Sequence, residues 1–175
     1  KLILQNQAGN AILTTGNIAT DTIFPAGMIL QVVPFTSATA TNVTSATTWV
    51  SIPASSVTII SRQANSKFLY HFDASVEVDV TSTSQGNFAQ IARNGTKVTA
   101  SNQNVAVGSD SHESSPAIVF TYTDSPLTAI GTTITYTIEV YRTTTQSWQI
   151  NQQNLSSQPS GTSMNSNGYV MEIAV

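Results

Sequence analysis

Apolar and polar residues alternate with a period of two along most of this chain, and no window of a dozen residues follows the 3.6-residue spacing of an amphipathic helix. The longest alternating run covers Phe68 to Val80. Its even-numbered residues are all apolar, whereas the odd-numbered ones include His71 and Asp73. Successive side chains of a strand point to opposite faces, so one face of this run is predicted to line a core. The pattern predicts a nearly all-β protein.

Two further segments, Ile118 to Thr123 and Ile134 to Tyr141, repeat this half-buried antiparallel pattern. Between residues 88–93 and 96–107, the pair Asn94-Gly95 predicts a type I′ hairpin, because both central residues tolerate a positive φ. Shorter extended candidates lie at residues 28–33, 48–52, 57–61, 147–150 and 169–175. About ten short antiparallel strands joined by polar turns predict a jelly-roll sandwich.

With 175 residues, the chain has the length of one domain with at most a short appendage. Residues 1–24 are predicted to form an extended stalk or connector, because Gly9-Asn10 and Gly16-Asn17 break its short apolar pieces. Pro25 and Gly27 then mark the start of a head domain, predicted to span residues 25–175. The first residue is Lys1 and no secretory or transit signal follows, so we expect that the chain was cut from a longer one.

Charged residues make up only 9% of the sequence, against about 25% in an average soluble protein. Ser, Thr, Asn and Gln together number 73, so hydroxyl and amide groups must solvate most of the surface. Six basic against nine acidic residues, without a basic run, argue against nucleic-acid binding. No apolar stretch approaches the roughly 18 residues of a membrane span, which argues against membrane insertion. Without cysteine, disulfides and thiolate chemistry are excluded.

The sequence contains few side chains that could serve in acid–base catalysis or in metal binding. Only two histidines and nine carboxylates are present, and no spacing among them selects the facing pair of a glycosidase or a catalytic triad. Two sets could bind a divalent cation, one on the face of the longest strand and one in the loop at 108–116: His71, Asp73, Glu77 and Asp79, and Asp110, His112 and Glu113. An ordinary solvated face or a polar subunit contact is the favoured explanation of the first set. The loop set lacks the ligand spacing of a known metal motif, and a plain surface loop is favoured there. We therefore expect no enzyme, catalytic residue, metal or cofactor.

The two tryptophans lie in different surroundings. Trp49 stands in an alternating segment beside Val50, which favours packing. Trp148 stands among amide and hydroxyl residues and is followed by a long polar stretch, residues 151–168. An aromatic ring can stack on a sugar while amides bind its hydroxyls, although packing under the loop is an equal alternative. The candidate ligand-binding residues are Trp148, Asn151, Gln152 and Asn154.

An ordered set of short motifs runs through the chain: 27–33 (GMILQVV), 48–50 (TWV), 66–69 (SKFL), 93–96 (RNGT), 123–126 (TDSP), 135–138 (TYTI) and 171–174 (MEIA). In this order and spacing they resemble a β-rich terminal domain of bacteriophage fibre and other virion-surface proteins, over about residues 25–175. The resemblance implies a jelly-roll head similar to the trimeric C1q/TNF-like heads, mounted on a fibrous stalk at the outside of a virus particle. It implies no catalytic residues.

Apolar residues on opposite strand faces, such as Phe88 and Ile91, exceed what one sandwich interior needs. We therefore expect a homotrimer, which also contacts other virion proteins through residues 1–24 and a host-surface glycan through its outer loops. Those loops are expected opposite the stalk: residues 34–46, 62–67, 94–95, 124–132 and 151–168. The predicted function is a tail-fibre or fibre-tip protein for host attachment, at the virion surface. The alternatives are a capsid decoration or head-fibre protein, and a secreted carbohydrate-binding or depolymerising module.

Overall fold

The computed structural model describes residues 3–9, 11–14, 24–39, 41–43, 48–78, 85–98, 103–108, 117–142, 148–153, 162–163 and 165–175. Regular structure in these ranges is β, apart from one turn of 3₁₀ helix, η1 (Pro53–Ser55). The described part of the chain therefore contains no helix with the length and hydropathy needed to span a bilayer. The all-β prediction is confirmed.

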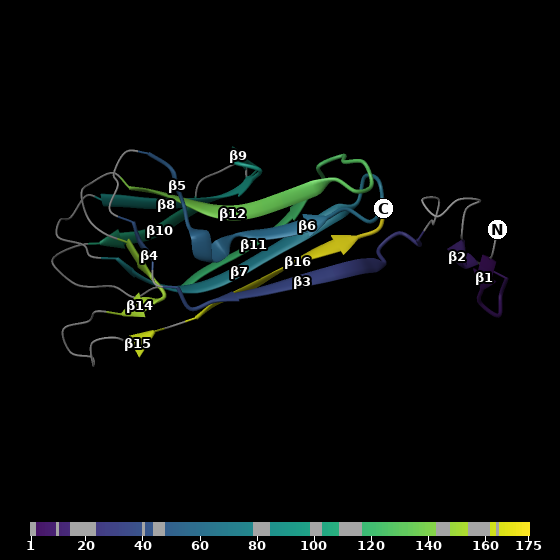
Figure 1. Ribbon diagram of the computed structural model, residues 1–175, viewed down its shortest axis with the longest axis horizontal. Helices are drawn as coiled ribbons and strands as arrows, with labels where there is room; N and C mark the ends of the chain where they lie inside the picture. The colour runs from purple at the N-terminus through teal and green to yellow at the C-terminus, as the bar shows by residue number, and fades with distance from the viewer. Residues whose placement is uncertain are drawn as a thin grey trace.

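Two antiparallel sheets pack face to face (Figure 1). The first sheet has the order β3-β16-β7-β13-β4, with β11 also paired to β7. Its strands are β3 (Ile29–Ser37), β4 (Thr41–Val43), β7 (Lys67–Val78), β11 (Ala117–Asp124), β13 (Trp148–Ile150) and β16 (Ser166–Ile173). The second sheet has the order β10-β8-β12-β5, with β6 paired to β12 and β9 to β8. Its strands are β5 (Val50–Ser51), β6 (Val57–Ile60), β8 (Gln85–Arg93), β9 (Thr96–Lys97), β10 (Gln103–Gly108) and β12 (Thr133–Arg142).

The connectivity is that of a jelly roll. Four antiparallel pairs join the first half of the chain to the second from the outside inward: β3 with β16, β6 with β12, β7 with β11, and β8 with β10. Alternate pairs belong to alternate sheets, so the chain behaves as one long folded-back hairpin that is wound into a sandwich. The predicted antiparallel jelly-roll sandwich is confirmed.

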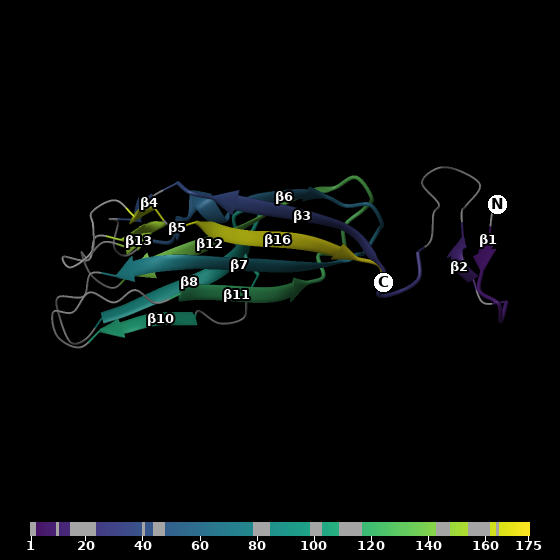
Figure 2. The ribbon, with the colours of Figure 1, turned by 90° about the horizontal axis from the view of Figure 1, so that it is seen from below.

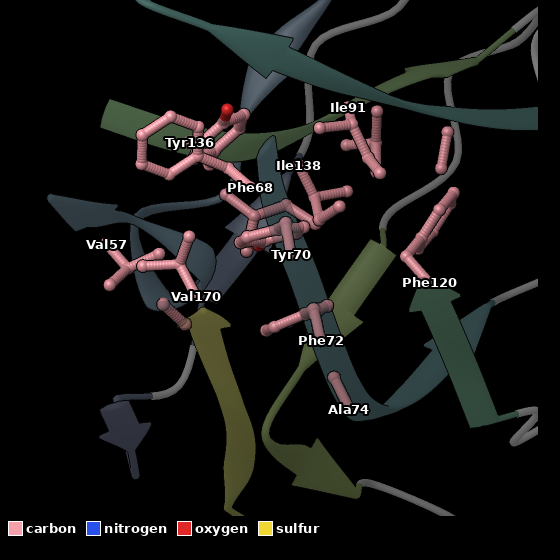
Figure 3. Close-up of a cluster of buried hydrophobic side chains, with 14 of the residues drawn as sticks. Val57, Phe68, Tyr70, Phe72, Ala74, Ile91, Phe120, Tyr136, Ile138 and Val170 are labelled. Carbon is pink, nitrogen blue, oxygen red and sulfur yellow. The ribbon is translucent and has the colours of Figure 1, made fainter. Parts of the chain in front are cut away.

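The core lies between the sheets and is rich in aromatic rings (Figure 3). Phe68, Tyr70, Phe72 and Ala74 line the inner face of β7, as the alternation predicted. Tyr70 stacks on Tyr136 of the opposite sheet, with 5.6 Å between ring centroids. Burial of these large side chains supplies most of the hydrophobic stabilisation, at roughly 25 cal/mol per Å² of apolar surface.

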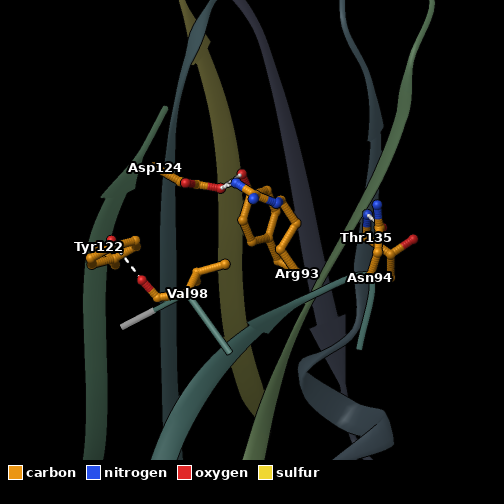
Figure 4. Close-up of polar contacts among 7 residues, drawn as sticks. Arg93, Asn94, Val98, Tyr122, Asp124 and Thr135 are labelled. Carbon is orange, nitrogen blue, oxygen red and sulfur yellow. Dashed lines mark hydrogen bonds and ion pairs between the residues drawn. The ribbon is translucent and has the colours of Figure 1, made fainter. Parts of the chain in front are cut away.

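Local geometry agrees with the predicted hairpin at Asn94-Gly95. Both residues have positive φ, 49° and 76°, as a type I′ turn requires. The Asn94 backbone N–H donates to Thr135 O and its side-chain oxygen accepts from the Thr135 N–H, each at 2.8 Å (Figure 4). These two bonds anchor the turn to β12. The strand that follows is shorter than predicted, because β9 ends at Lys97 and the pairing resumes in β10.

Position 168 in β16 requires glycine because neighbouring atoms leave no room for a Cβ, and not because the backbone turns there. A Cβ at this position would lie 2.4 Å from Phe35 Cζ and 2.5 Å from the backbone oxygen of His71. The Phe35 ring packs on Tyr70 and Phe72, so it covers the glycine and seals this edge of the core.

At the N-terminus, β1 (Ile3–Gln5) and β2 (Ala11–Thr14) form an antiparallel hairpin. Its turn is closed by the Gly9 N–H donating to Asn6 O at 2.9 Å. The hairpin lies beyond the end of the sandwich at which the C-terminus lies (Figures 1 and 2). A stalk at residues 1–24 and a head at residues 25–175 stay predictions.

Antiparallel order makes consecutive strands run in opposite directions, so successive turns alternate between the two ends of the sandwich. The turns at residues 61–66 and 125–132 contact each other, since the Gly131 N–H donates to Ser61 O at 2.8 Å. The first of them also touches the C-terminus, through Gln63 Nε2 and Val175 O. The expectation that residues 62–67 and 124–132 lie opposite the end that holds Met28 and Val175 is therefore wrong. Residues 94–95 are also not at the far end, because Asn94 bonds Thr135 near the start of β12. Of the described segments expected there, the end of β3, the short strands at residues 41–43, 152–153 and 162–163, and the start of β16 do lie at the far end.

Candidate functional site

The strands β3, β16, β7 and β11 of the first sheet lie side by side (Figure 2), and their outward side chains make one outer surface of the sandwich. It is formed by the residues that alternate with the core-facing ones in β3, β16, β7 and β11. These are Val32, Pro34, Thr36, Asn167, Tyr169, Met171, Ile173, Lys67, Leu69, His71, Asp73, Val119, Thr121 and Thr123. We call this set the outer face.

Strand register places the apolar members of the outer face side by side. Met171 lies opposite Val32 on one side and Leu69 on the other, and Tyr169 lies opposite Pro34 and His71 in the next row. Val32 and Val119 are about half exposed, at 48% and 54%. Among the described side chains of this face, Asp73 carries the carboxylate and Lys67 the ammonium group. The two are six residues apart on β7. The row of Val32, Met171 and Leu69 is therefore apolar, and Asp73 and Lys67 lie in rows toward the two ends of β7.

The opposite surface, on the second sheet, has a different character. Its outward residues on β6 and β12 are mainly threonines, and Thr58 and Thr135 share a hydrogen bond of 2.9 Å between their hydroxyls. Gln90 donates to the Glu139 carboxylate at 2.7 Å. A polar surface of this kind is stable in water, whereas a contiguous apolar patch marks a site of association. The outer face of the first sheet is the candidate interface.

His71 is held within the outer face. Its ring stacks on Tyr169, with 5.1 Å between centroids, and Nδ1 lies 2.9 Å from the Thr121 hydroxyl. No group of three His, Asp or Glu residues that could hold a metal ion occurs in the described ranges. The side chain of Glu77, Asp79 and the predicted set Asp110, His112 and Glu113 lie outside the described residues.

The structure does not place Asn151 in a surface loop, where the sequence predicted that it binds ligand. It is fully buried with φ of 59°, a conformation that asparagine tolerates better than most residues. Its amide donates to Ser37 O and Thr39 O at 2.9 and 3.2 Å, and its oxygen accepts from the Ser166 hydroxyl at 2.6 Å. The side chain thus ties the end of β3 to the start of β16, so it is unavailable to a saccharide. The alternating pattern gave no signal for this role.

The other predicted ligand-binding residues are only partly described. Trp148 lies in β13, which pairs with β4 and β7, and Gln152 lies in β14 (Gln152–Gln153), which pairs with β15 (Thr162–Ser163). Their side chains, and Asn154 altogether, lie outside the described residues. A saccharide site at these residues stays a prediction. Trp49 packs on Tyr141 with 5.4 Å between ring centroids and is half-buried, so it lies at the margin of the sandwich.

One partly buried ionic network, with a buried carboxylate, links the two sheets (Figure 4). Asp124 of β11 accepts from Arg93 of β8 at 2.5 Å and from the Tyr136 hydroxyl of β12 at 2.7 Å. Burial, reinforced by this carboxylate, raises the pKa of Tyr136 far above its usual range. The Asp124 carboxylate is committed to structure, because a charge-assisted pair between sheets fixes their relative position.

A second buried carboxylate, Glu172 of β16, joins the chain end to the turn at residues 61–66. It accepts from the backbone N–H groups of Arg62 and Gln63, at distances from 2.8 to 3.1 Å. The Gln31 amide donates to it at 2.6 Å. Successive backbone N–H groups form a concave site for an anion, and here the chain's own carboxylate fills it. Sequence reasoning singled out neither Asp124 nor Glu172, because nothing in their spacing distinguishes them from the other carboxylates.

Together the fold and its surfaces define a jelly-roll sandwich with one apolar outer face. No family model matches the chain, and no curated protein matches it. Solved structures of infectious bursal disease virus are similar to it. A VP2 subviral particle shares 14% identity at a TM-score of 0.46 over 95% of this chain. The Gt strain shares 15% at 0.45 over 95%, and the Gx strain 14% at 0.40 over 93%. This chain spans 38–43% of the length of those chains.

Proposed function

We propose that this chain is a structural protein of a virion, the trimeric head of a tail fibre or fibre tip that attaches the particle to its host. The observation that supports the proposal is the apolar outer face on a jelly roll whose first strand begins, and last strand ends, at one end of the sandwich. The proposal assigns the head no catalytic reaction.

Association follows from the outer face. An isolated copy leaves Val32 exposed and Leu69 and Met171 partly exposed, and a closed ring of copies covers the outer face without creating a free edge. Three copies is the number that the resemblance to trimeric heads implies. In such a ring the N-terminal segments run together at one end, which makes a common shaft, and the opposite end faces outward.

Attachment follows from the surface chemistry and from valency. A surface with few charges limits nonspecific binding, and neutral amides and hydroxyls suit a saccharide target. Three identical sites on one rigid body raise the overall affinity by about 10²–10⁴ over a single site. Individually weak contacts are then sufficient for host recognition.

The oligomer is tested by light scattering of the purified chain, where we expect a mass near three times 18.5 kDa. Met171→Glu places a charge at the centre of the outer face, and an uncompensated buried charge costs about 3 kcal/mol or more, which is over 100-fold in the dissociation constant. Thr133→Glu, exposed on the second sheet, is the matched control. A monomer at micromolar concentration, or a trimer that survives Met171→Glu, would overturn the proposed interface.

The location is tested by antibody labelling of particles from the source virus. Label on tail fibres supports the fibre head, and label over the capsid supports the decoration protein instead. The virion role would be wrong if particles lacked the chain. If a bacterium also secreted the chain and it bound polysaccharide, the protein would instead be a carbohydrate-binding module.

A further inference from the structure

The end of the sandwich that holds the C-terminus exposes a second set of large apolar side chains. Met28, Ile60, Leu127, Ile130 and Val175 are all 43–78% exposed. Backbone hydrogen bonds of Met28 and of residues next to the other four join the segments at this end, among them Ala174 N–H to Met28 O and Gly131 N–H to Ser61 O. We call these five residues the end patch.

Leu127 is the most unusual member of the end patch. It is 78% exposed and has φ of +51°, a conformation that L-residues other than glycine and asparagine rarely adopt. The loop around it is held firmly, since the Asn65 N–H donates to Thr128 O and the Thr132 hydroxyl donates to Ala129 O. The loop thus presents a large apolar side chain to water from a strained backbone. Neither the strain nor the exposure stabilises the isolated chain.

The N-terminal hairpin has matching properties and lies beyond the same end (Figures 1 and 2). Residues 2–20 contain no charged side chain, and Ile3 and Leu4 of β1 are 44% and 48% exposed. A lone two-stranded hairpin is marginally stable in water, so it needs an apolar surface to pack against. Nine residues separate β2 from Phe24, and nine residues can bridge at most about 30 Å, so the hairpin stays near this end of the sandwich.

We propose that the N-terminal hairpin of one copy packs on the end patch of a neighbouring copy, with Ile3 and Leu4 against Leu127 and Ile130. Within one chain these side chains remain exposed, so the chain's own hairpin does not cover its end patch. The inference rests on the proposed oligomer and deepens it. Exchange of hairpins between copies couples the ordering of the shaft to the assembly of the heads.

Disulfide trapping tests the contact, because the natural chain has no cysteine. Leu127→Cys chains carrying a mass tag are co-expressed with untagged Ile3→Cys chains and oxidised. We expect a reducible band that joins one tagged to one untagged chain. Since the two cysteines are on different chains, an intrachain bond cannot produce this band. The matched control pairs Ile3→Cys with tagged Thr58→Cys, which is exposed on the second sheet and should not cross-link.

The outcomes separate this inference from the proposed function. An oligomer of normal mass in which Leu127→Cys and Ile3→Cys chains do not join would overturn hairpin exchange and leave the trimeric head intact. A cross-link that appears only when both cysteines are in one chain would also overturn the exchange, because the hairpin would then dock on its own end patch. A monomer by light scattering would overturn the oligomer itself.

Discussion

Two buried tyrosines should make this protein unfold in alkali, and their contribution can be worked out from the structure. Tyr70 and Tyr136 are fully buried and stacked in the core. The Tyr70 hydroxyl donates to Ser55 O at 2.8 Å, and that of Tyr136 donates to Asp124. Burial raises the pKa of both phenols far above the ordinary value of about 10.

The sign follows from proton linkage. Below pH 10 both phenols are neutral in the folded and the unfolded chain, so their contribution to stability does not change with pH. Above pH 10 the unfolded chain loses both protons, whereas the folded chain keeps them. The free energy of unfolding then falls by about 1.4 kcal/mol per pH unit for each tyrosine, or about 2.7 for the pair. Between pH 10 and pH 12 the loss is about 5 kcal/mol, comparable to the total stability of many domains.

The assay is urea unfolding at several values between pH 8 and pH 12, for the natural chain and Tyr70→Phe. At pH 8 the variant should be less stable by about 1 kcal/mol, because Ser55 O loses its hydrogen bond. Its alkaline slope should be shallower by about 1.4 kcal/mol per pH unit, so the two stability curves should cross near pH 11. Parallel curves between pH 10 and pH 12 would refute the reasoning, since Tyr70 would then ionise without unfolding.

Three substitutions test other parts of the fold. Gly168→Ala should destabilise by about 3 kcal/mol or more, because its Cβ would meet both Phe35 and a backbone oxygen; an unchanged midpoint of urea unfolding would show that β16 shifts freely. Asn151→Ala should cost about 2 kcal/mol by leaving the Ser37 and Thr39 carbonyls unpaired, and unaltered protease sensitivity of the β3 end would contradict this. Arg93→Met should cost about 3 kcal/mol by leaving Asp124 buried without its cation, whereas equal thermal stability would show that Tyr136 alone satisfies the carboxylate.

The strands that were predicted well have one face toward the core and the other toward solvent. The run from Phe68 matched β7, and the segments at residues 118–123 and 134–141 lie within β11 and β12, because alternation reports directly on burial of one face. The turn at Asn94-Gly95 was also predictable, since its geometry depends on two residues alone.

Contacts between residues far apart along the chain could not be predicted from the sequence. Asn151 donates to Ser37 O and Thr39 O, more than a hundred residues earlier in the chain, and these bonds form because β3 pairs with β16. The direction of each strand decided at which end residues 124–132 lie, and the order of strands decided that Met171 stands between Val32 and Leu69.

Local alternation and turn chemistry by themselves determined that this chain forms antiparallel strands with a sparsely charged surface. Pairing of the first half of the chain with the second decided the rest: the jelly-roll order, the apolar outer face and the end patch. The reason is physical, because a strand has two faces in its own sequence, but which of them meets water, core or another copy depends on neighbours that lie far away along the chain.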